Sequence, residues 1–218
     1  MVVGLCLSSL FASGWLAATG DDKLGIGGRA VSQVGLWTGL VGAVVLAARR
    51  KGTGRVADDF GFRARWSDVG LGLGAAVALQ VVLVPLVALV LSPLLGRPEV
   101  SGPVQELVDS AGGASFALLV LTAVVCAPLV EELYFRGLLL RSLEHRFGTG
   151  WAIAGSSVLF GLAHPNHLSA AGVVLVMTSL AALAAVLALL VVRTGRLGPA
   201  IVAHAAFNAI NLTVAYLR

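Results

Sequence analysis

The chain has 218 residues, of which 58% are hydrophobic and 12% are charged, and its mean hydropathy is +0.94. A soluble domain of this length carries about 25% charged residues, so this composition excludes an ordinary water-soluble globular protein and indicates a membrane protein. The net charge of +4 does not indicate nucleic-acid binding, because the basic residues lie at the ends of apolar segments. The expected surroundings are therefore a lipid bilayer, with no nucleic-acid partner.

Long apolar runs divide the chain, and runs of about 20 residues predict membrane helices because backbone groups cannot stay unpaired in lipid. Seven such segments are predicted, at 1–20, 30–48, 69–95, 114–140, 150–164, 170–192 and 198–217. We therefore expect an all-α, polytopic membrane protein with about seven transmembrane helices. The first segment is expected to be a retained span, because no Lys or Arg precedes its apolar run as in a signal peptide.

The first two segments differ in kind from the last four. Their interiors carry no ionisable residue, and we interpret them as packing or anchoring helices. We expect an N-terminal unit at 1–68, with these helices and a basic loop, and a helical membrane core at 69–218. Small-xxx-small spacings, which permit close helix contact, occur at Gly35 and Gly39 and at Gly70 and Gly74. Two cysteines inside apolar runs, Cys6 and Cys126, are predicted to be buried thiols.

The polar stretch 49–68 is rich in basic residues and sets the expected orientation. Strict alternation of the seven segments places eleven basic residues on its side of the membrane: Arg49, Arg50, Lys51, Arg55, Arg63, Arg65, Arg136, Arg141, Arg146, Arg193 and Arg196. Four fall on the other side: Lys23, Arg29, Arg97 and Arg218. Because cytoplasmic loops are enriched in Lys and Arg, this predicts a multi-pass protein of the cell membrane with a cytoplasmic N-terminus.

The fourth segment ends in a cluster of charges within apolar sequence. Charge inside a membrane helix costs about 2.5–3.5 kcal/mol per residue, so such residues point to function. Glu132 and Arg136 are four residues apart and are expected to form an ion pair. Glu131 points in another direction, so the ion pair leaves it without a partner. Pro128 removes a backbone hydrogen bond and is expected to kink the helix here.

Two further segments supply polar residues that could meet this cluster. Pro165 disfavours helical geometry at His164, so this imidazole is expected at a helix end, with His167 in the loop beyond it. His204 and Asn208 are four residues apart and share one face of the last segment. Burying them in lipid is costly unless they meet polar partners, and the obvious partners lie in the charged cluster and at His164. We therefore expect these side chains to converge on one intramembrane polar cavity.

Such a cavity has the groups needed to hydrolyse an amide without a serine or cysteine nucleophile. A carboxylate in an apolar setting is a plausible general base, a neutral His can orient the water, and His and Asn donors can stabilise an oxyanion. Glu131, His164 and His204 could equally hold a zinc ion, and the sequence does not distinguish a zinc site from a metal-free site. The chain lacks HExxH, GxSxG and a pair of intramembrane aspartates, which disfavours three other protease mechanisms.

Three motifs in order, Glu131-Glu132-x-x-x-Arg136, Phe160-x-x-x-His164 and His204-x-x-x-Asn208, resemble the signature of the CPBP family. That family comprises CAAX-type prenyl endopeptidases and bacteriocin-processing or immunity proteins. The resemblance covers about residues 114–211 and implies an intramembrane, all-helical peptidase. It implies that Glu131 activates water with help from His164, that His204 and Asn208 stabilise the oxyanion, and that Glu132 and Arg136 hold the cluster. Family members are described as metalloproteases, and a metal-free glutamate mechanism is also proposed; we favour the latter because no close, helix-fixed ligand pair is present.

The expected substrate is a membrane-associated peptide or protein, such as a bacteriocin precursor. Arg far outnumbers Lys, and Ala, Gly, Val and Leu dominate, which is typical of GC-rich bacterial genomes, whereas prenylated CAAX proteins are a eukaryotic substrate class. One alternative is a non-catalytic binding or bacteriocin-immunity protein that uses the same cavity. Another is a small transporter with a charge relay, which the absence of an inverted repeat of broken helices disfavours.

Overall fold

The computed structural model describes residues 1–164 and 168–218, and within these ranges the fold is entirely helical. The elements in chain order are α1 (Val2–Thr19), α2 (Ile26–Lys51), α3 (Val56–Phe60), α4 (Ser67–Ala78), η1 (Leu79–Leu83), α5 (Val84–Leu95), α6 (Gly102–Asp109), α7 (Ala114–Val120), η2 (Leu121–Cys126), α8 (Ala127–Glu132), η3 (Leu133–Leu139), α9 (Leu140–Phe147), α10 (Thr149–Leu162), α11 (Ala170–Thr194) and α12 (Gly198–Tyr216). The elements η1, η2 and η3 are π-helical stretches within longer helices.

Six continuous helices in the described ranges are long and apolar enough to cross a membrane: Val2–Thr19, Ile26–Lys51, Ser67–Leu95, Ala114–Phe147, Ala170–Thr194 and Gly198–Tyr216. The prediction of an all-α, polytopic membrane protein is confirmed. The segment predicted at 150–164 forms α10, whose 14 residues cover about 21 Å at about 1.5 Å per residue. The hydrocarbon core is about 30 Å thick, so a helix of this length that begins at one face ends short of the other.

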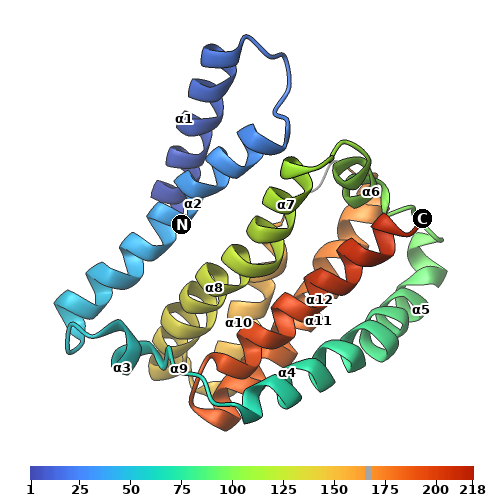
Figure 1. The fold of residues 1–218 in the computed structure, drawn as a ribbon. Coiled ribbons are helices and arrows are strands. Elements are labelled where there is room, and N and C mark those ends of the chain that lie inside the picture. The colour runs from blue at the N-terminus through green and yellow to red at the C-terminus, as the bar shows by residue number, and fades with distance from the viewer. Residues whose placement is uncertain (165–167) are drawn as a thin grey trace.

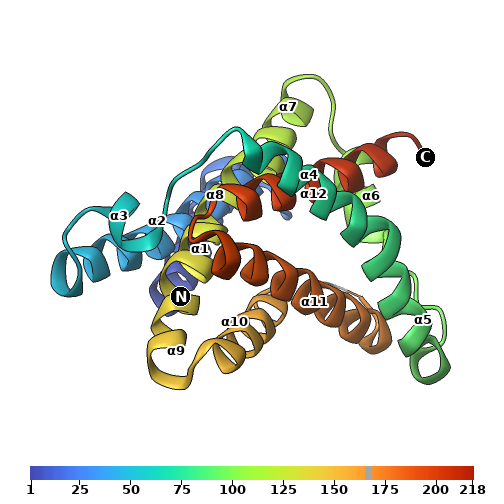
Figure 2. The same ribbon diagram turned by 90° about the horizontal axis from the view of Figure 1, so that it is seen from below.

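The helices are arranged around α12 and the α7–α9 helix (Figures 1 and 2). The α1–α2 hairpin lies on one flank of the molecule and the α4–α5 helix on the other (Figure 2). A methyl group on Gly35 or Gly39 would collide with the backbone of α1, so these glycines permit the close contact between α1 and α2. Gly70 and Gly74 face open space, and that pair of glycines therefore has no such role.

Helix α1 packs mainly on α2 and leaves most of its apolar side chains exposed. Cys6 in α1 is exposed and Cys126 is only partly buried. The prediction of two buried thiols is therefore wrong for Cys6, because a helix at the edge of the bundle presents its outer face to the surroundings.

The two ends of the bundle differ in composition. Helices α3 and α9 and the turn between α11 and α12 lie at one end, and the α1–α2 loop, α6 and the C-terminus lie at the other (Figure 1). Trp66, just before α4, and Trp151, in the first turn of α10, lie at the first end and are 94% and 77% exposed, as expected of aromatic side chains at a membrane–water interface. The same end carries most of the arginines, and its cytoplasmic location stays a prediction from their distribution.

Asp68 in the first turn of α4 connects this helix to the turn that precedes α12. Its carboxylate is almost fully buried and accepts hydrogen bonds from the Arg65 backbone N–H at 2.8 Å and from the Arg196 guanidinium at 2.5–3.0 Å. Because α12 carries His204 and Asn208, this contact helps to fix the start of a helix that forms the site.

Replacing Asp68 with Asn is expected to lower the free energy of unfolding by about 1.5–3 kcal/mol, because hydrogen bonds to a charged group contribute about that much. Thermal unfolding in detergent measures the effect. Asp58→Asn is the matched control, since its ion pairs with Arg55 and Arg63 are exposed and such pairs contribute at most about 1 kcal/mol. Equal, small shifts in the two variants would contradict the structural role of Asp68.

Candidate active site

Glu131 and Glu132 end α8, and both carboxylates are buried, with exposed fractions of 7% and 0%. Successive helical residues are about 100° apart, so the two side chains meet different neighbours. Glu132 accepts a hydrogen bond from Arg136 at 2.7 Å, and its Oε1 lies 2.8 Å from Nδ1 of His204. Oε2 of Glu131 lies 3.6 Å from Nε2 of His164 and 4.0 Å from Nε2 of His204. The predicted Glu132–Arg136 ion pair is confirmed, and Glu131 points away from it.

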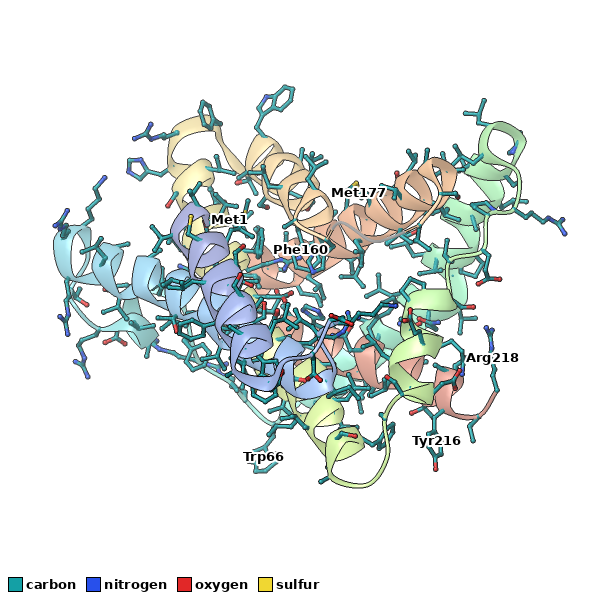
Figure 3. The ribbon with its side chains drawn as sticks, turned by 90° about the horizontal axis from the view of Figure 1, so that it is seen from above. Met1, Trp66, Phe160, Met177, Tyr216 and Arg218 are labelled. Carbon is teal, nitrogen blue, oxygen red and sulfur yellow. The ribbon has the colours of Figure 1, made fainter. Side chains whose placement is uncertain are left out.

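Arg136 crosses the interior of the bundle and is 1% exposed. Besides the ion pair, its guanidinium donates to the backbone carbonyl of Ala184 in α11 at 3.3 Å. Its Cζ lies 4.5 Å from the ring centroid of Phe160 in α10, where the face of the ring stabilises the cation. Phe160 lies in the interior, whereas Trp66 and Tyr216 lie at the periphery (Figure 3). Arg136 therefore joins η3 to α10 and α11 behind the carboxylates.

The hydrogen bonds of the two histidines fix where their protons lie. Nδ1 of His164 is 2.7 Å from the backbone carbonyl oxygen of Phe160, and Nδ1 of His204 is 2.8 Å from the carboxylate of Glu132. A carbonyl oxygen and an ionised carboxylate only accept hydrogen bonds, so both Nδ1 atoms must donate. In the neutral rings Nε2 then carries a lone pair, and both Nε2 atoms face Glu131.

Asn208 is held by a carbonyl that Pro128 leaves without its helical partner. In η2 the backbone pairs each carbonyl with the N–H five residues later, as in the Ala127 N–H to Thr122 bond. The next bond in this register would join Ala123 to Pro128, which has no N–H. Nδ2 of Asn208 donates to the Ala123 carbonyl at 2.8 Å instead. The irregularity expected at Pro128 thus takes the form of a π-helical stretch, and one N–H of the Asn208 amide is left for another acceptor.

Four of the six residues expected in the site line one cavity of about 320 Å³: Glu131, His164, His204 and Asn208. We call this the polar cavity. Glu132 and Arg136 lie behind it and hold His204 and α10. The prediction that the four side chains converge on one cavity is confirmed, and the short α10 explains how His164 reaches the depth of Glu131.

A second cavity, of about 380 Å³, reaches Glu131 and His164 between α2, α10 and the start of α1. We call it the α1–α2 cavity, and apart from Gln33, Glu131 and His164 its lining is apolar: Met1, Leu5, Leu36, Leu40, Phe135, Leu162 and Ala163. A larger hollow of about 670 Å³ lies along α2 between Val34 and Arg49, away from these residues.

Helix α2 packs against α1 and also contributes to both cavities, a part that its interpretation as a packing or anchoring helix did not include. Arg29 lines the polar cavity, and Gln33 lines both cavities. The signal in the sequence was two polar residues four apart on an otherwise apolar face. The roles of the Ala123 and Ala184 carbonyls as acceptors could not be predicted from the sequence, because every residue has a backbone carbonyl.

The described residues contain no group of three or more His, Cys, Asp or Glu side chains arranged to hold a metal ion. His167, which was expected in the loop beyond His164, lies outside the described residues. The Nδ1 hydrogen bonds of His164 and His204 are nevertheless of the kind that zinc-bound histidines make. Chelation and re-addition of zinc distinguish the zinc alternative from a carboxylate base at this site.

Residues 113–210, from the start of α7 into α12, match the family model described as type II CAAX prenyl endopeptidase Rce1-like. The matched region contains all three motifs and therefore every residue of the predicted site. Comparisons with curated proteins and with solved structures gave no match. The resemblance stated from the motifs is confirmed by this match to the Rce1-like type II CAAX prenyl endopeptidase model at residues 113–210, which is consistent with the CPBP family.

Proposed function

We propose that this protein is an intramembrane endopeptidase in which Glu131 activates the attacking water. The observation that carries the proposal is a buried carboxylate that faces two imidazole nitrogens in a cavity within a bundle of membrane helices. The family match implies protease activity, and a protease in a bilayer acts on membrane-associated substrates. The proposed substrates are membrane-associated peptides, such as bacteriocin precursors, or membrane proteins of the same cell.

The gap between Glu131 and His164 suits a water molecule. At 3.6 Å their facing atoms are too far apart for a good direct hydrogen bond. A water between them would donate one proton to each, which leaves its oxygen lone pairs free to attack a carbonyl carbon. Glu131 then takes the proton as the new C–O bond forms, and later returns it to the amine nitrogen as the C–N bond breaks.

Asn208 and His204 are proposed to stabilise the oxyanion of the tetrahedral intermediate. Asn208 has an N–H beyond the one that Ala123 accepts. His204 donates from Nε2 only when its ring is protonated, because Nδ1 already donates to Glu132. Glu132 and Arg136 are proposed to hold this arrangement in place.

Replacing Asn208 with Leu is expected to reduce kcat by about 10²–10³-fold, the usual effect of removing one oxyanion donor. The measurement is the rate of peptide cleavage by purified protein. Asn211→Leu is the matched control, because Asn211 lies on the same helix and contacts Gln80 at 3.3 Å, away from the residues that line the polar cavity. Equal losses in the two variants would show that Asn208 acts only in packing.

The proposed function is tested with membrane-anchored fluorogenic peptides and purified protein in detergent, with mass spectrometry of the products. Cleavage that continues after chelation supports the carboxylate mechanism. Cleavage that chelation abolishes and zinc restores would reassign Glu131, His164 and His204 as metal ligands. Saturable peptide binding without cleavage across a broad library would favour the non-catalytic, immunity-type alternative.

A further inference from the structure

The polar cavity and the α1–α2 cavity meet at three residues. Gln33, Glu131 and His164 line both of them, and the other lining residues belong to one cavity only. A peptide that passes from one cavity into the other therefore runs past Glu131 and His164 on one side and Gln33 of α2 on the other. Helix α2 lies outside the region that matches the family model.

Gln33 has an amide that the protein itself does not use. In the described ranges of the chain, no hydrogen bond of its side chain is present. Gln80, by contrast, donates to Asn211 at 3.3 Å, and Ser8 pairs with Ser32 at 2.8 Å. An unpaired amide in an apolar helix is costly, and this favours a ligand as its partner.

The peptide bond that is cleaved is such a ligand. To reach Glu131 it must leave helical structure, and its neighbouring N–H and C=O groups then need new partners within the membrane. A glutamine side chain offers one acceptor and two donors, which matches both backbone groups. Gln33 is placed to supply these hydrogen bonds beside the reacting carbonyl.

Arg29 lines the polar cavity but not the α1–α2 cavity. It lies one helical turn before Gln33, and its Nε donates to the Leu24 carbonyl at 3.2 Å. No carboxylate of the described chain lies within ion-pair distance of it, and its two terminal nitrogens remain for a bidentate carboxylate. On the other side of Glu131, the α1–α2 cavity presents Leu36, Leu40 and Leu162.

We propose that α2 selects the substrate, with Gln33 binding the peptide backbone beside the scissile bond and Arg29 binding a substrate carboxylate in the polar cavity. The substrate class is a peptide that is apolar on one side of the scissile bond and carries a carboxylate on the other. The carboxylate is either a chain terminus or an Asp or Glu side chain. The inference rests on the proposed endopeptidase function.

The test of Arg29 uses three peptides with the same apolar segment: one with a free C-terminal carboxylate, one with a C-terminal amide, and one with the amide and a single added Glu. Wild-type protein is expected to prefer a carboxylate peptide at least tenfold in kcat/KM. In Arg29→Gln this preference should disappear through a higher KM for the carboxylate peptide. Arg97→Gln, which removes an exposed arginine outside the linings of both cavities, should retain the preference. The peptide that loses its advantage identifies which carboxylate is bound, and an absence of any preference in wild type overturns the role of Arg29.

The test of Gln33 separates binding from chemistry. Gln33→Leu is expected to raise KM about tenfold for all three peptides and to leave their order unchanged. Thr38→Val is the control, because the Thr38 hydroxyl bonds the Val34 carbonyl at 2.8 Å away from both cavities. An unchanged KM in Gln33→Leu overturns its role.

Equilibrium binding of the same peptides distinguishes the two levels of the proposal. Binding that depends on Arg29 and Gln33, without cleavage, retains the inference and contradicts the endopeptidase function. Cleavage that does not depend on Arg29 or Gln33 supports the endopeptidase function and contradicts the inference about α2.

Discussion

Replacing Glu131 with Gln is expected to slow peptide cleavage by about 10²–10⁴-fold, the usual contribution of a general base. Glutamine keeps the size of the side chain and its place in the polar cavity, but it cannot take a proton from water. Helix α8 should be unaffected, because the internal ion pair is made by Glu132. The measurement is kcat on a membrane-anchored peptide, together with thermal unfolding to show that the variant is folded.

Glu106→Gln provides the control for Glu131→Gln, because Glu106 is an exposed residue of α6. It should cleave at the wild-type rate. A folded Glu131→Gln protein that still cleaves within a fewfold of wild type would remove Glu131 from the role of base and leave the site without an assigned one.

Replacing Arg136 with Met is expected to cost about 3–5 kcal/mol of stability, because it leaves the buried carboxylate of Glu132 without its cation. Contacts to the Ala184 carbonyl and the Phe160 ring are lost as well. The effect should appear as a large fall in Tm in detergent. Arg146→Met, at the exposed end of α9, should leave Tm nearly unchanged.

A second substitution separates the charge of Arg136 from its packing. Adding Glu132→Gln to Arg136→Met removes the stranded carboxylate, so the double variant should be more stable than Arg136→Met alone. If the two losses simply add, the pair contributes little through charge and the effect comes from the packing of the long Arg side chain.

The sequence predicted most of the site because charge in an apolar helix is conspicuous. Glu131, His164, His204 and Asn208 stand out against their neighbours, and each needs a polar partner, so their convergence followed from the cost of leaving them unpaired. The same reasoning paired Glu132 with Arg136. The roles of these residues in catalysis remain predictions that the variants test.

Other features of the structure could not be predicted in this way. Hydropathy marks α10 as a span but does not show that it stops short, and it gives no sign of where π-helical pairing replaces α-helical pairing. The role of α2 was missed because Arg29 and Gln33 lie among lipid-compatible residues, and their facing partner is a cavity formed by distant segments. Such features depend on how the helices pack, which hydropathy and motif spacing do not specify.

The π-helical stretch η2 also determines which mutations this helix can accept. A backbone that pairs five residues apart holds one residue more than an α-helix would place in the same stretch. Deleting Leu121 or Thr122 would let α-helical pairing continue without turning α8 relative to α7. In α-helical pairing the Ala127 N–H would bond the Ala123 carbonyl, so Asn208 would lose the acceptor that holds its side chain. We therefore expect this stretch to accept exchanges among apolar residues and to reject a change in its length.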